Sequence, residues 1–562
     1  MYLIGIDVGG TFTDGALTKS GTILHSNKTA TNNFNLSESL FTTLDKLLVN
    51  VSDTKLIERI VISTTAVTNL LATGNVEPTA LVLIPGYGLP NSYYKIGDYT
   101  YFLKGVIDFR GNETEEINRD EVEKLIKEIK KLKIKRIAIA GKFSNRNNKH
   151  EELVKELFNK LYPEALVLTS SSISNQLNFS RRAATTYYTS MIYHEWNNFV
   201  DNVEKALEAR NIQTEVHVLK ADGGTVPLEV SRMYPCQTIY SGPAASTMGG
   251  VALTMDNTNS VVIDIGGTTS DISLLIEGEP LHASKGAVIK DRFTHVDAFS
   301  VTSLPLGGDS QITFTDDKIG LDKRVGVAAC FGGKGVTVTD VFNTFYELEI
   351  GDYENSLENI KSFADKHDIS VDVVTKEAIN IVLNSLETAI EFMFKQWEKE
   401  PAYKVWEVVN ERKFKLERII GVGAASTAIV PVLAKHLNVS HFIHEYSPVA
   451  NALGTSVTRP TINVNLHVDT ENSYYSIEPG GFFDKITNSF EFNIEDAKEL
   501  ALNHLHNTLK ERGISGYDDE ATFYMEEQFN VIRGWNRGGR IFDIGVQIKP
   551  GFINEFTGVA DI

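Results

Sequence analysis

Apolar positions in the first 220 residues alternate between short strand-like runs and longer segments with helical spacing. The segments 119–133, 150–161 and 183–207 place apolar side chains every three or four residues, as on the buried face of a helix. The runs predicted as strands are 60–63, 79–84, 137–140, 165–169 and 216–219. This alternation predicts an α/β fold.

The second half begins with glycine turns and short strands at 280–345, followed by a long amphipathic helix at 375–399. A strand and glycine turn at 416–423 then lead into a helix at 428–437. Beyond Pro460 the pattern changes to alternating strands and one charged helix, 494–512, which predicts a separate α+β unit. The predicted divisions are 1–172 (N-terminal domain), 173–250 (helical and connecting region), 251–460 (second domain) and 461–562 (C-terminal unit).

One segment of the chain occurs twice. Residues 4–17 read IGIDVGGTFTDGAL and residues 261–274 read VVIDIGGTTSDISL, so that Asp7 corresponds to Asp264. Each copy consists of a β-branched run, the motif Asp-x-Gly-Gly-Thr and a second apolar run. This pattern predicts a β-hairpin with a glycine turn. The chain is therefore expected to contain two copies of one structural device.

The repeated motif has the chemistry of a phosphate site. Paired glycines allow the backbone to approach an anion closely, and threonine hydroxyls add hydrogen-bond donors. Asp7 and Asp264 are the candidate catalytic residues and the candidate ligands of Mg²⁺, or of Mn²⁺, because such an ion is held by one or two carboxylates together with phosphate oxygens. The candidate phosphate-binding residues are Gly9, Gly10, Thr11, Thr13, Asp14, Gly266, Gly267, Thr268, Thr269 and Asp271.

A single motif of this kind is also found in ordinary hairpin turns, whereas two copies indicate a nucleotide. The pair resembles the phosphate motifs of actin-like ATPases. A third segment, IIGVGAAS at 419–426, is similar to the adenosine motif of that fold through Gly421, Gly423 and Ala424. The resemblance implies duplicated actin-like (ribonuclease H-like) domains with ATP bound in a cleft between them. The two halves are expected to be joined by segments near 241–253 and 446–458.

Further motifs narrow the resemblance to the A-type subunit of the hydantoinase/oxoprolinase family, over roughly residues 1–460. They are, in order, STTAVTN at 63–69, DGGTVPLEVSRMYPCQTIYSGPAAS at 222–246, GGKGVTVTD at 332–340 and YSPVANALGTSV at 446–457. The chain departs from the family pattern in three places. Residues 307–310 read GGDS where GGGS is frequent, Ser246 replaces a glycine, and the stretch 318–335 is shorter.

The resemblance implies an ATP-dependent hydrolase subunit that phosphorylates a small cyclic amide, such as hydantoin or 5-oxoproline, or traps an enolate. A B-type partner subunit would then complete ring opening or carboxylation. Two alternatives stay open on the sequence. One is a small-molecule or sugar kinase of the same fold, in which an aspartate accepts the hydroxyl proton. The other is a non-enzymatic, actin- or chaperone-like protein that ATP switches between conformations.

Composition is that of an ordinary globular protein, with 42% hydrophobic and 23% charged residues. The formal net charge of -19 disfavours binding to nucleic acid and to anionic membranes. The N-terminal residues show no secretory pattern, and no apolar run reaches the length of a membrane span, so a cytoplasmic location is expected. Cys236 and Cys330 are expected to be inert thiols, too few for a disulfide framework or a zinc or iron–sulfur centre.

Several other polar residues have both a structural and a functional interpretation. His295 and Asp297 lie two residues apart, as metal ligands on one strand face do, but two residues do not make a site and packing is favoured. Ser241 is expected to cap a helix N-terminus. Arg181 and Arg182 either clamp a carboxylate-bearing substrate or simply begin a surface helix.

Overall fold

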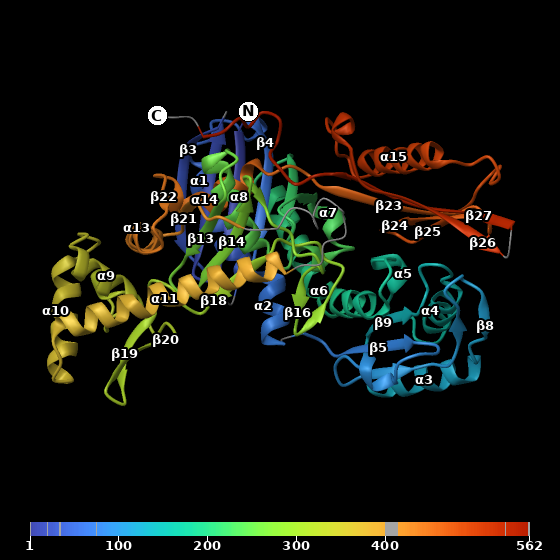
Figure 1. The fold of residues 1–562 in the computed structure, drawn as a ribbon, viewed down its shortest axis with the longest axis horizontal. Coiled ribbons are helices and arrows are strands. Elements are labelled where there is room, and N and C mark those ends of the chain that lie inside the picture. The colour runs from blue at the N-terminus through green and yellow to red at the C-terminus, as the bar shows by residue number, and fades with distance from the viewer. Residues whose placement is uncertain are drawn as a thin grey trace.

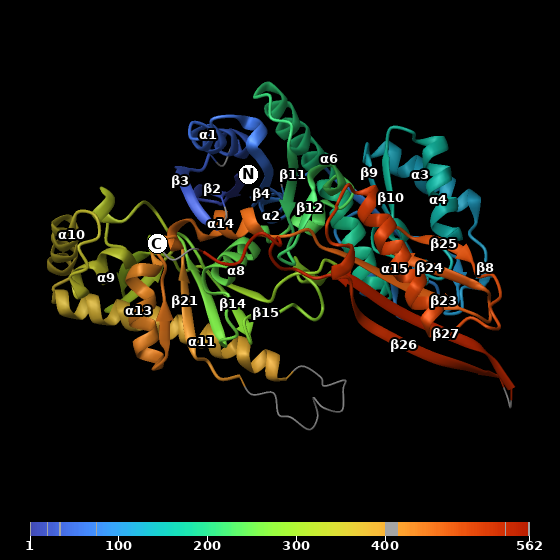
Figure 2. The same ribbon diagram turned by 90° about the horizontal axis from the view of Figure 1, so that it is seen from above.

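Two β-sheets lie side by side at the centre of the molecule, with further units at either end (Figures 1 and 2). The computed structural model describes residues 2–559, with the exception of residues 20, 33–34, 75, 400–413 and 534–535. Within this part of the chain, no helix is both long and apolar enough to cross a membrane.

The first central sheet has the strand order β12-β11-β4-β1-β2-β3. Strand β1 pairs antiparallel with β2 and parallel with β4, and β4 in turn pairs parallel with β11. The strands are β1 (Tyr2–Val8), β2 (Phe12–Lys19), β3 (Thr22–Ala30), β4 (Ile57–Thr64), β11 (Glu215–Leu219) and β12 (Thr225–Pro227). Helices α1 (Leu36–Leu48), α2 (Ala66–Thr73) and α6 (Phe179–Ala209) contribute to its hydrophobic core.

The second central sheet repeats this plan. It has the order β15-β14-β13-β21-β22, and β18 also pairs with β14. Strand β13 pairs antiparallel with β14 and parallel with β21, as β1 does with β2 and β4. The internal repeat of the sequence thus reflects two equivalent hairpins, each beside a parallel strand. The strands are β13 (Ser260–Ile265), β14 (Ser270–Ile276), β15 (Glu279–Pro280), β18 (Val301–Leu304), β21 (Arg418–Val422) and β22 (Ser440–Phe442).

A pair of short helices, α8 (Ser241–Thr254) and α14 (Ala450–Val457), connects the two sheets. Both contact β1 and β4, while Leu253 and Leu453 also join a core cluster with residues of β13 and β21. The helices cross at two glycines. A Cβ on Gly454 would lie 2.3 Å from the backbone nitrogen of Gly249. The joining segments predicted near 241–253 and 446–458 correspond to α8 and α14. The backbones of these two helices are in direct contact.

Each half carries an insertion. A four-stranded sheet of order β10-β9-β5-β6 lies beyond α6. It consists of β5 (Thr79–Ile84), β6 (Thr100–Phe102), β9 (Arg136–Gly141) and β10 (Leu166–Thr169), with α3 (Arg119–Lys131), α4 (Lys149–Leu161), α5 (Ser170–Ile173) and the β7 (Val106–Ile107) and β8 (Glu113–Glu115) pair. The second half adds β16 (Val288–Ile289), β17 (Arg292–Phe293), β19 (Gln311–Thr315), β20 (Lys318–Asp322), α9 (Val338–Tyr346), α10 (Tyr353–Lys366), α11 (Val371–Glu398) and α13 (Ser426–Leu437).

The C-terminal residues form a five-stranded antiparallel sheet of order β25-β24-β23-β27-β26, with α15 (Ile494–Glu511) packed on it. The strands are β23 (Ile462–Asp469), β24 (Tyr474–Glu478), β25 (Phe482–Lys485), β26 (Thr522–Arg533) and β27 (Asn536–Ile548). In Figures 1 and 2 this unit lies beside the β5–β10 insertion, at the end of the molecule opposite α10.

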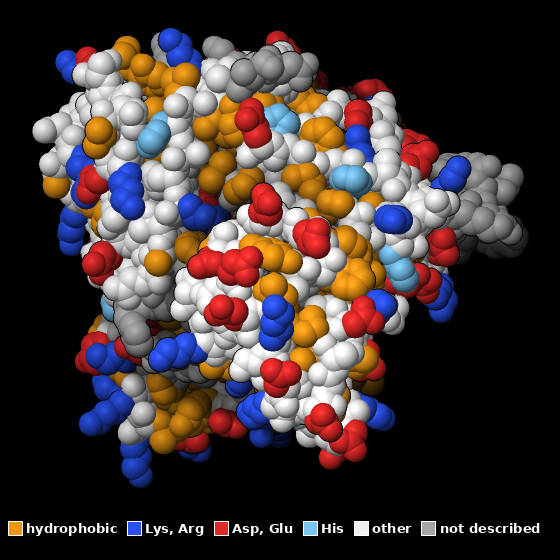
Figure 3. All heavy atoms as spheres, turned by 90° about the vertical axis from the view of Figure 1, so that its left-hand side faces the viewer, with side chains coloured by type: hydrophobic (Ala, Val, Ile, Leu, Met, Phe, Trp, Pro, Cys, Tyr) orange, Lys and Arg blue, Asp and Glu red, His pale blue; other side chains and the backbone are white. Residues whose placement is uncertain are grey.

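The strands and helices predicted from hydrophobic spacing are present, with ends shifted by no more than four residues. The domain boundaries stay a prediction. Strands β11 and β12, from the stretch expected to be helical and connecting, complete the first central sheet. On the face shown in Figure 3, acidic and basic side chains are interspersed among hydrophobic ones.

Candidate functional site

The two repeated hairpins place four carboxylates in matching positions. Asp7 lies directly opposite Asp14 across the β1–β2 pair, and Asp264 lies opposite Asp271 across β13–β14. Each glycine turn is closed by a backbone hydrogen bond, from Gly9 to Phe12 (3.1 Å) and from Gly266 to Thr269 (3.0 Å). The hairpins are thus equivalent in detail as well as in topology.

The two turns face one another. The hydroxyl oxygens of Thr11 and Thr268 are 3.4 Å apart, although the two turns connect strands of different sheets. Thr268 and Thr269 are exposed and Thr11 is partly exposed, whereas Thr13 is fully buried and its hydroxyl lies 2.9 Å from that of Thr31. Three of the four predicted threonines therefore stand at the surface between the halves.

Asn451 on α14 joins the aspartates of the two hairpins. Its Nδ2 donates to Asp7 Oδ2 (3.2 Å) and to Asp264 Oδ2 (3.1 Å). Ser246 on α8 donates a further hydrogen bond to Asp264 Oδ2. Asp7 and Asp264 consequently meet at one point, fixed by the helix pair that connects the sheets.

The site concentrates negative charge in a water-poor setting. Burial raises the pKa of Asp7 to about 7, with the Asp14 and Asp264 carboxylates adding to the effect. Burial, together with Asp264, raises the pKa of Asp271 to about 6. Oδ1 of Asp7 and Oδ1 of Asn451 are buried without a hydrogen-bond partner among the described residues. A cation placed here would relieve both the repulsion and the unsatisfied oxygens.

Asp7 gives the stability of the ligand-free protein a distinctive pH dependence. Because its folded-state pKa of about 7 exceeds the usual 3.8, the folded state favours the protonated form, and stability is lost as pH rises from about 4 to 7. Asp7→Asn should therefore raise the free energy of unfolding at pH 8 by roughly 4 kcal/mol and flatten this part of the curve.

Urea denaturation from pH 4 to 8 measures this effect, with Asp372→Asn on the exposed surface of α11 as the matched control. An Asp7→Asn protein that is no more stable than the wild type at pH 8 would contradict this account of the buried carboxylate.

Two cations border the carboxylates. The ammonium of Lys28 on β3 contacts both oxygens of Asp14, at 2.6 and 2.7 Å. The second aspartate of the first hairpin is therefore already paired with a cation. Arg324 lies between the halves. Its Nε is 3.2 Å from Asp309 Oδ2, and its Nη1 donates to Thr11 Oγ1 at 3.2 Å. Arg324 therefore presents a guanidinium at the glycine turns, where a phosphate would benefit from it.

The loop at 307–310 packs tightly on the second turn. The backbone nitrogens of Gly308 and Asp309 donate to the carbonyl oxygens of Gly266 and Gly267, each at 2.9 Å. A Cβ on Gly307 would lie 2.6 Å from backbone atoms of Gly267 and Thr268. The GGDS variation thus lies in direct contact with the second turn, and its aspartate positions Arg324.

The third glycine motif ends β21 beside the second hairpin. Gly423 has a φ of +84°, and a Cβ there would lie 2.3 Å from Asp264 Oδ1. Its nitrogen donates to Ser447 O (3.0 Å), and that of Ala425 donates to Ile265 O (3.1 Å). Gly421 lies in β21, while Ala424 follows Gly423 in the turn before α13. A residue other than glycine at 423 would displace Asp264.

These features fit a magnesium nucleotide. The described residues contain no group of three or more His, Cys, Asp or Glu that could hold a metal ion by themselves. Mg²⁺ needs only one or two carboxylates when phosphate oxygens complete its coordination, and Asp7 and Asp264 are suited to that arrangement. The glycine turns, exposed threonines and Arg324 are suited to the phosphates.

Sequence reasoning missed Asn451, Lys28 and Arg324. Asn451 lies within the 446–457 motif, whose only predicted role was to join the two halves, while Lys28 and Arg324 belong to none of the motifs. The capping role expected for Ser241 is wrong. Helix α8 begins at that residue with Tyr240 as its cap, and Ser241 Oγ bonds instead to the backbone of Thr64.

The two arginines at the start of α6 differ in environment. The Arg182 guanidinium is buried and donates to Gln176 O, Gly141 O and Ser170 Oγ, which excludes the expected carboxylate clamp and the expected surface position. Arg181 donates through Nε to Thr294 O (3.1 Å) and lines a groove.

The duplicated hairpin sheets and the site between them define an α/β protein of the actin-like ATPase fold. Two solved structures agree with this over nearly the whole chain. Nucleotide-free acetone carboxylase has a TM-score of 0.70 at 16% identity, covering 99% of this chain and 89% of that one. The ATP-dependent caprolactamase of Pseudomonas jessenii has a TM-score of 0.70 at 17% identity, covering 97% and 87%.

The chain belongs to the hydantoinase/oxoprolinase family. The model of the family's N-terminal region matches residues 3–162, and the main hydantoinase/oxoprolinase model matches residues 182–464. The resemblance inferred from the motifs is thereby confirmed.

Curated relatives match at 24–26% identity over parts of both chains. Caprolactamase subunit alpha of Pseudomonas jessenii is 25% identical over 248 residues, or 42% of this chain and 35% of that protein. The 5-oxoprolinase of Saccharomyces cerevisiae is 24% identical over 364 residues, 60% of this chain and 27% of that protein. An uncharacterised protein of Methanocaldococcus jannaschii is 26% identical over 233 residues, 39% and 34%. The matches thus span about a third or less of each relative.

Proposed function

We propose that this chain binds Mg-ATP between its two hairpins and phosphorylates the amide oxygen of a small cyclic amide, so that the ring is opened with the help of a partner subunit. The observation that carries the proposal is the meeting of Asp7 and Asp264 at Asn451, directly below two glycine turns whose threonine hydroxyls are 3.4 Å apart. Two carboxylates below two phosphate-type turns suit a metal–triphosphate pair.

Each part of the site has a proposed role. Asp7 and Asp264 hold Mg²⁺, which when bound neutralises charge on the phosphates. The turns at Gly9–Gly10 and Gly266–Gly267 donate backbone hydrogen bonds to phosphate oxygens, with Thr11, Thr268 and Thr269 adding hydroxyl donors. Gly421, Gly423 and Ala424 leave room for the adenosine beside β21. Arg324 is freed from Thr11 to pair with the phosphates.

In the proposed reaction, phosphoryl transfer from ATP precedes opening of the amide ring. ATP supplies a γ-phosphoryl group, which the amide oxygen accepts as ADP leaves. The phosphorylated amide carbon is then electrophilic. Addition of a first water and cleavage of the C–N bond free the amine and leave an acyl phosphate, which a second water hydrolyses to phosphate and the ring-opened amino acid. This chain's residues align the oxygen with the phosphate and exclude competing water.

Relatives support this choice of substrate and partner. Their names include caprolactamase subunit alpha, 5-oxoprolinase and acetophenone carboxylase gamma subunit, of which the first two act on cyclic amides and two are named as subunits. By analogy we propose a B-type partner subunit for this chain, and a cytoplasmic location stays a prediction.

ADP release distinguishes the alternatives. With Mg-ATP we expect slow release by the chain alone, and at least about tenfold stimulation by a lactam or hydantoin when the partner subunit is added, because substrate displaces water from the γ-phosphate. Hydantoins, 5-oxoproline, lactams, aryl ketones and sugars should each be assayed with and without the partner.

Stimulation by a sugar alone, with a stable phosphorylated product and no partner, would replace this function by the kinase alternative. Sedimentation of the protein in ATP-dependent filaments, without stimulation by any small molecule, would favour the non-enzymatic switch.

A further inference from the structure

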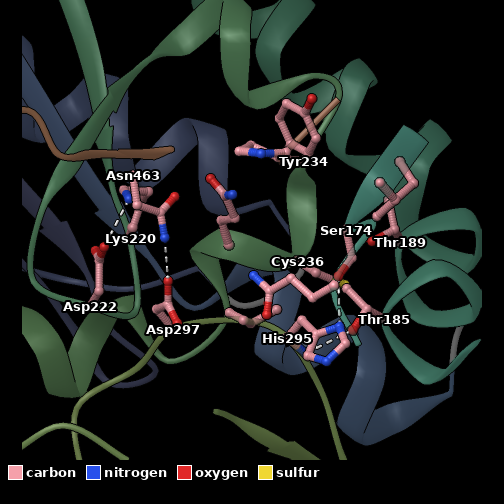
Figure 4. Close-up of a pocket in the computed structure, with 15 residues that line it drawn as sticks. Ser174, Thr185, Thr189, Lys220, Asp222, Tyr234, Cys236, His295, Asp297 and Asn463 are labelled. Atoms are coloured by element: carbon pink, nitrogen blue, oxygen red, sulfur yellow. Dashed lines mark hydrogen bonds and ion pairs between the residues drawn. The ribbon is translucent and has the colours of Figure 1, made fainter. Parts of the chain in front are cut away.

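A second group of polar side chains surrounds a recess where α5, α6 and the C-terminal sheet meet (Figure 4). The recess is small, about 50 Å³, and it adjoins a groove of about 740 Å³. Gln176, Lys220, Asp222, Asp297 and Asn463 line both spaces. The recess and the groove together have room for one small molecule, with part of the molecule in the recess and the rest in the groove.

One wall of the recess is an ion pair. Lys220 Nζ lies 2.8 Å from Asp222 Oδ2, and Asp222 also accepts from Gly224 N (2.9 Å) and Thr461 Oγ1 (3.2 Å). Although burial alone would raise the pKa of Asp222, Lys220 and these hydrogen bonds hold it below its usual value. The Lys220 charge is therefore neutralised, while its ammonium keeps hydrogens for a ligand.

Asp297 adds a further carboxylate. It accepts a hydrogen bond from Asn463 Nδ2 at 2.9 Å. The residue is exposed to solvent, although many protein atoms lie around it. Burial and the nearby Asp222 raise its pKa. Two carboxylates thus stand against one ammonium, so that an anion in the recess would be repelled.

The opposite wall is uncharged. His295 Nδ1 lies 2.6 Å from Ser174 Oγ, and burial together with Arg181 and Arg182 lowers its pKa to about 3. Burial raises the pKa of the Cys236 thiol to about 12. The recess therefore offers donors and acceptors without a metal ligand set, a nucleophilic thiolate or a titrating base.

The recess lies at the same sheet edge as the hairpin site. Strands β1, β4 and β11 are parallel, so their carboxyl ends share one edge. Asp7 is near the end of β1, and Lys220 directly follows β11, with β4 between them. At roughly 4.8 Å between neighbouring strands, the backbones of β1 and β11 are about 10 Å apart at this edge. They are separate but neighbouring.

We infer that this recess binds the substrate of the proposed reaction and selects an uncharged cyclic amide over one that carries a carboxylate. A lactam presents a carbonyl acceptor and an N–H donor side by side, which match the Lys220 ammonium and the Asp297 carboxylate. A carboxylate on the ring would face Asp222 and Asp297. Arg181 and Lys549 are cations that line the outer groove and not the recess, and Arg181 Nε is bound to Thr294 O. This inference rests on the proposed function.

Two ligands of equal size test it by calorimetry on the full chain with its partner: 5-oxoprolinamide, which is uncharged, and 5-oxoproline, which is anionic. We expect the wild type to bind the amide at least about tenfold more tightly, because like charges repel in a partly buried site. Asp297→Asn should reduce this preference about tenfold, and Lys220→Met should weaken binding of the amide about tenfold through a lost donor. Asp484→Asn on β25 is the matched surface control.

Equal binding of the two ligands to the wild type would overturn the inference, as would an unchanged preference in folded Asp297→Asn together with unchanged amide binding by folded Lys220→Met. Mg-ATP binding is measured in the same samples. This measurement distinguishes a failure of the recess assignment from a failure of the proposed function. If Mg-ATP binds normally while the ligand preference is absent, only the recess assignment fails. If Mg-ATP does not bind, the proposed function fails and the inference falls with it. Asp264→Asn should lose Mg-ATP binding and keep the preference for the amide.

Discussion

Replacing Asp264 with asparagine is expected to reduce Mg-ATP hydrolysis by about 100- to 1,000-fold and to leave the protein folded. Asp264 is one of two carboxylates that Asn451 brings together, and Gly423 is packed against it. A carboxylate that holds a metal ion at a phosphate contributes several kcal/mol, and each 1.4 kcal/mol changes a rate about tenfold. Asparagine keeps the size of the side chain and removes only the charge.

ADP release and calorimetry with Mg-ATP measure this effect, with Asp372→Asn as the matched control. Thermal unfolding should show no loss of stability, because removal of the Asp264 charge also relieves its repulsion of Asp7. The pKa of Asp7 should fall in this variant. Unchanged nucleotide affinity and ATPase activity in a folded Asp264→Asn protein would show that the hairpin turns are structural only.

Gly454→Ala is expected to destabilise the protein by about 3 kcal/mol, although alanine normally favours a helix by up to about 1 kcal/mol over glycine. The new Cβ would lie 2.3 Å from the backbone nitrogen of Gly249 and 2.7 Å from its Cα. Backbone atoms cannot rotate away as a side chain can, so α8 and α14 must separate. Asn451 on α14 would then move from Asp7 and Asp264, and nucleotide affinity should fall as well.

Urea denaturation and nucleotide titration of the same variant test both effects. Gly326→Ala is the control, since a Cβ there meets no atom within 4 Å and the backbone does not require glycine. A Gly454→Ala protein at least as stable as the wild type would contradict the close crossing of the two helices.

Hydrophobic spacing determined most of the secondary structure. The helix predicted at 150–161 is observed at Lys149–Leu161, and the strand predicted at 79–84 is observed with the same ends. Such elements depend on side chains within a few residues of each other, so local sequence contains the necessary information. The same holds for the hairpins, whose glycine turns and flanking strands are contiguous and occur twice.

Tertiary structure alone decided which distant residues complete the sites. Asn451 reaches Asp7 across 444 positions, and Arg324 reaches Thr11 across 313. The recess combines Ser174 and Lys220 with Asn463 from the C-terminal unit. No local spacing encodes such contacts, because they arise only when separate sheets pack around α8 and α14. The pKa of Asp7 likewise depends on burial and neighbouring carboxylates that only the folded chain brings together.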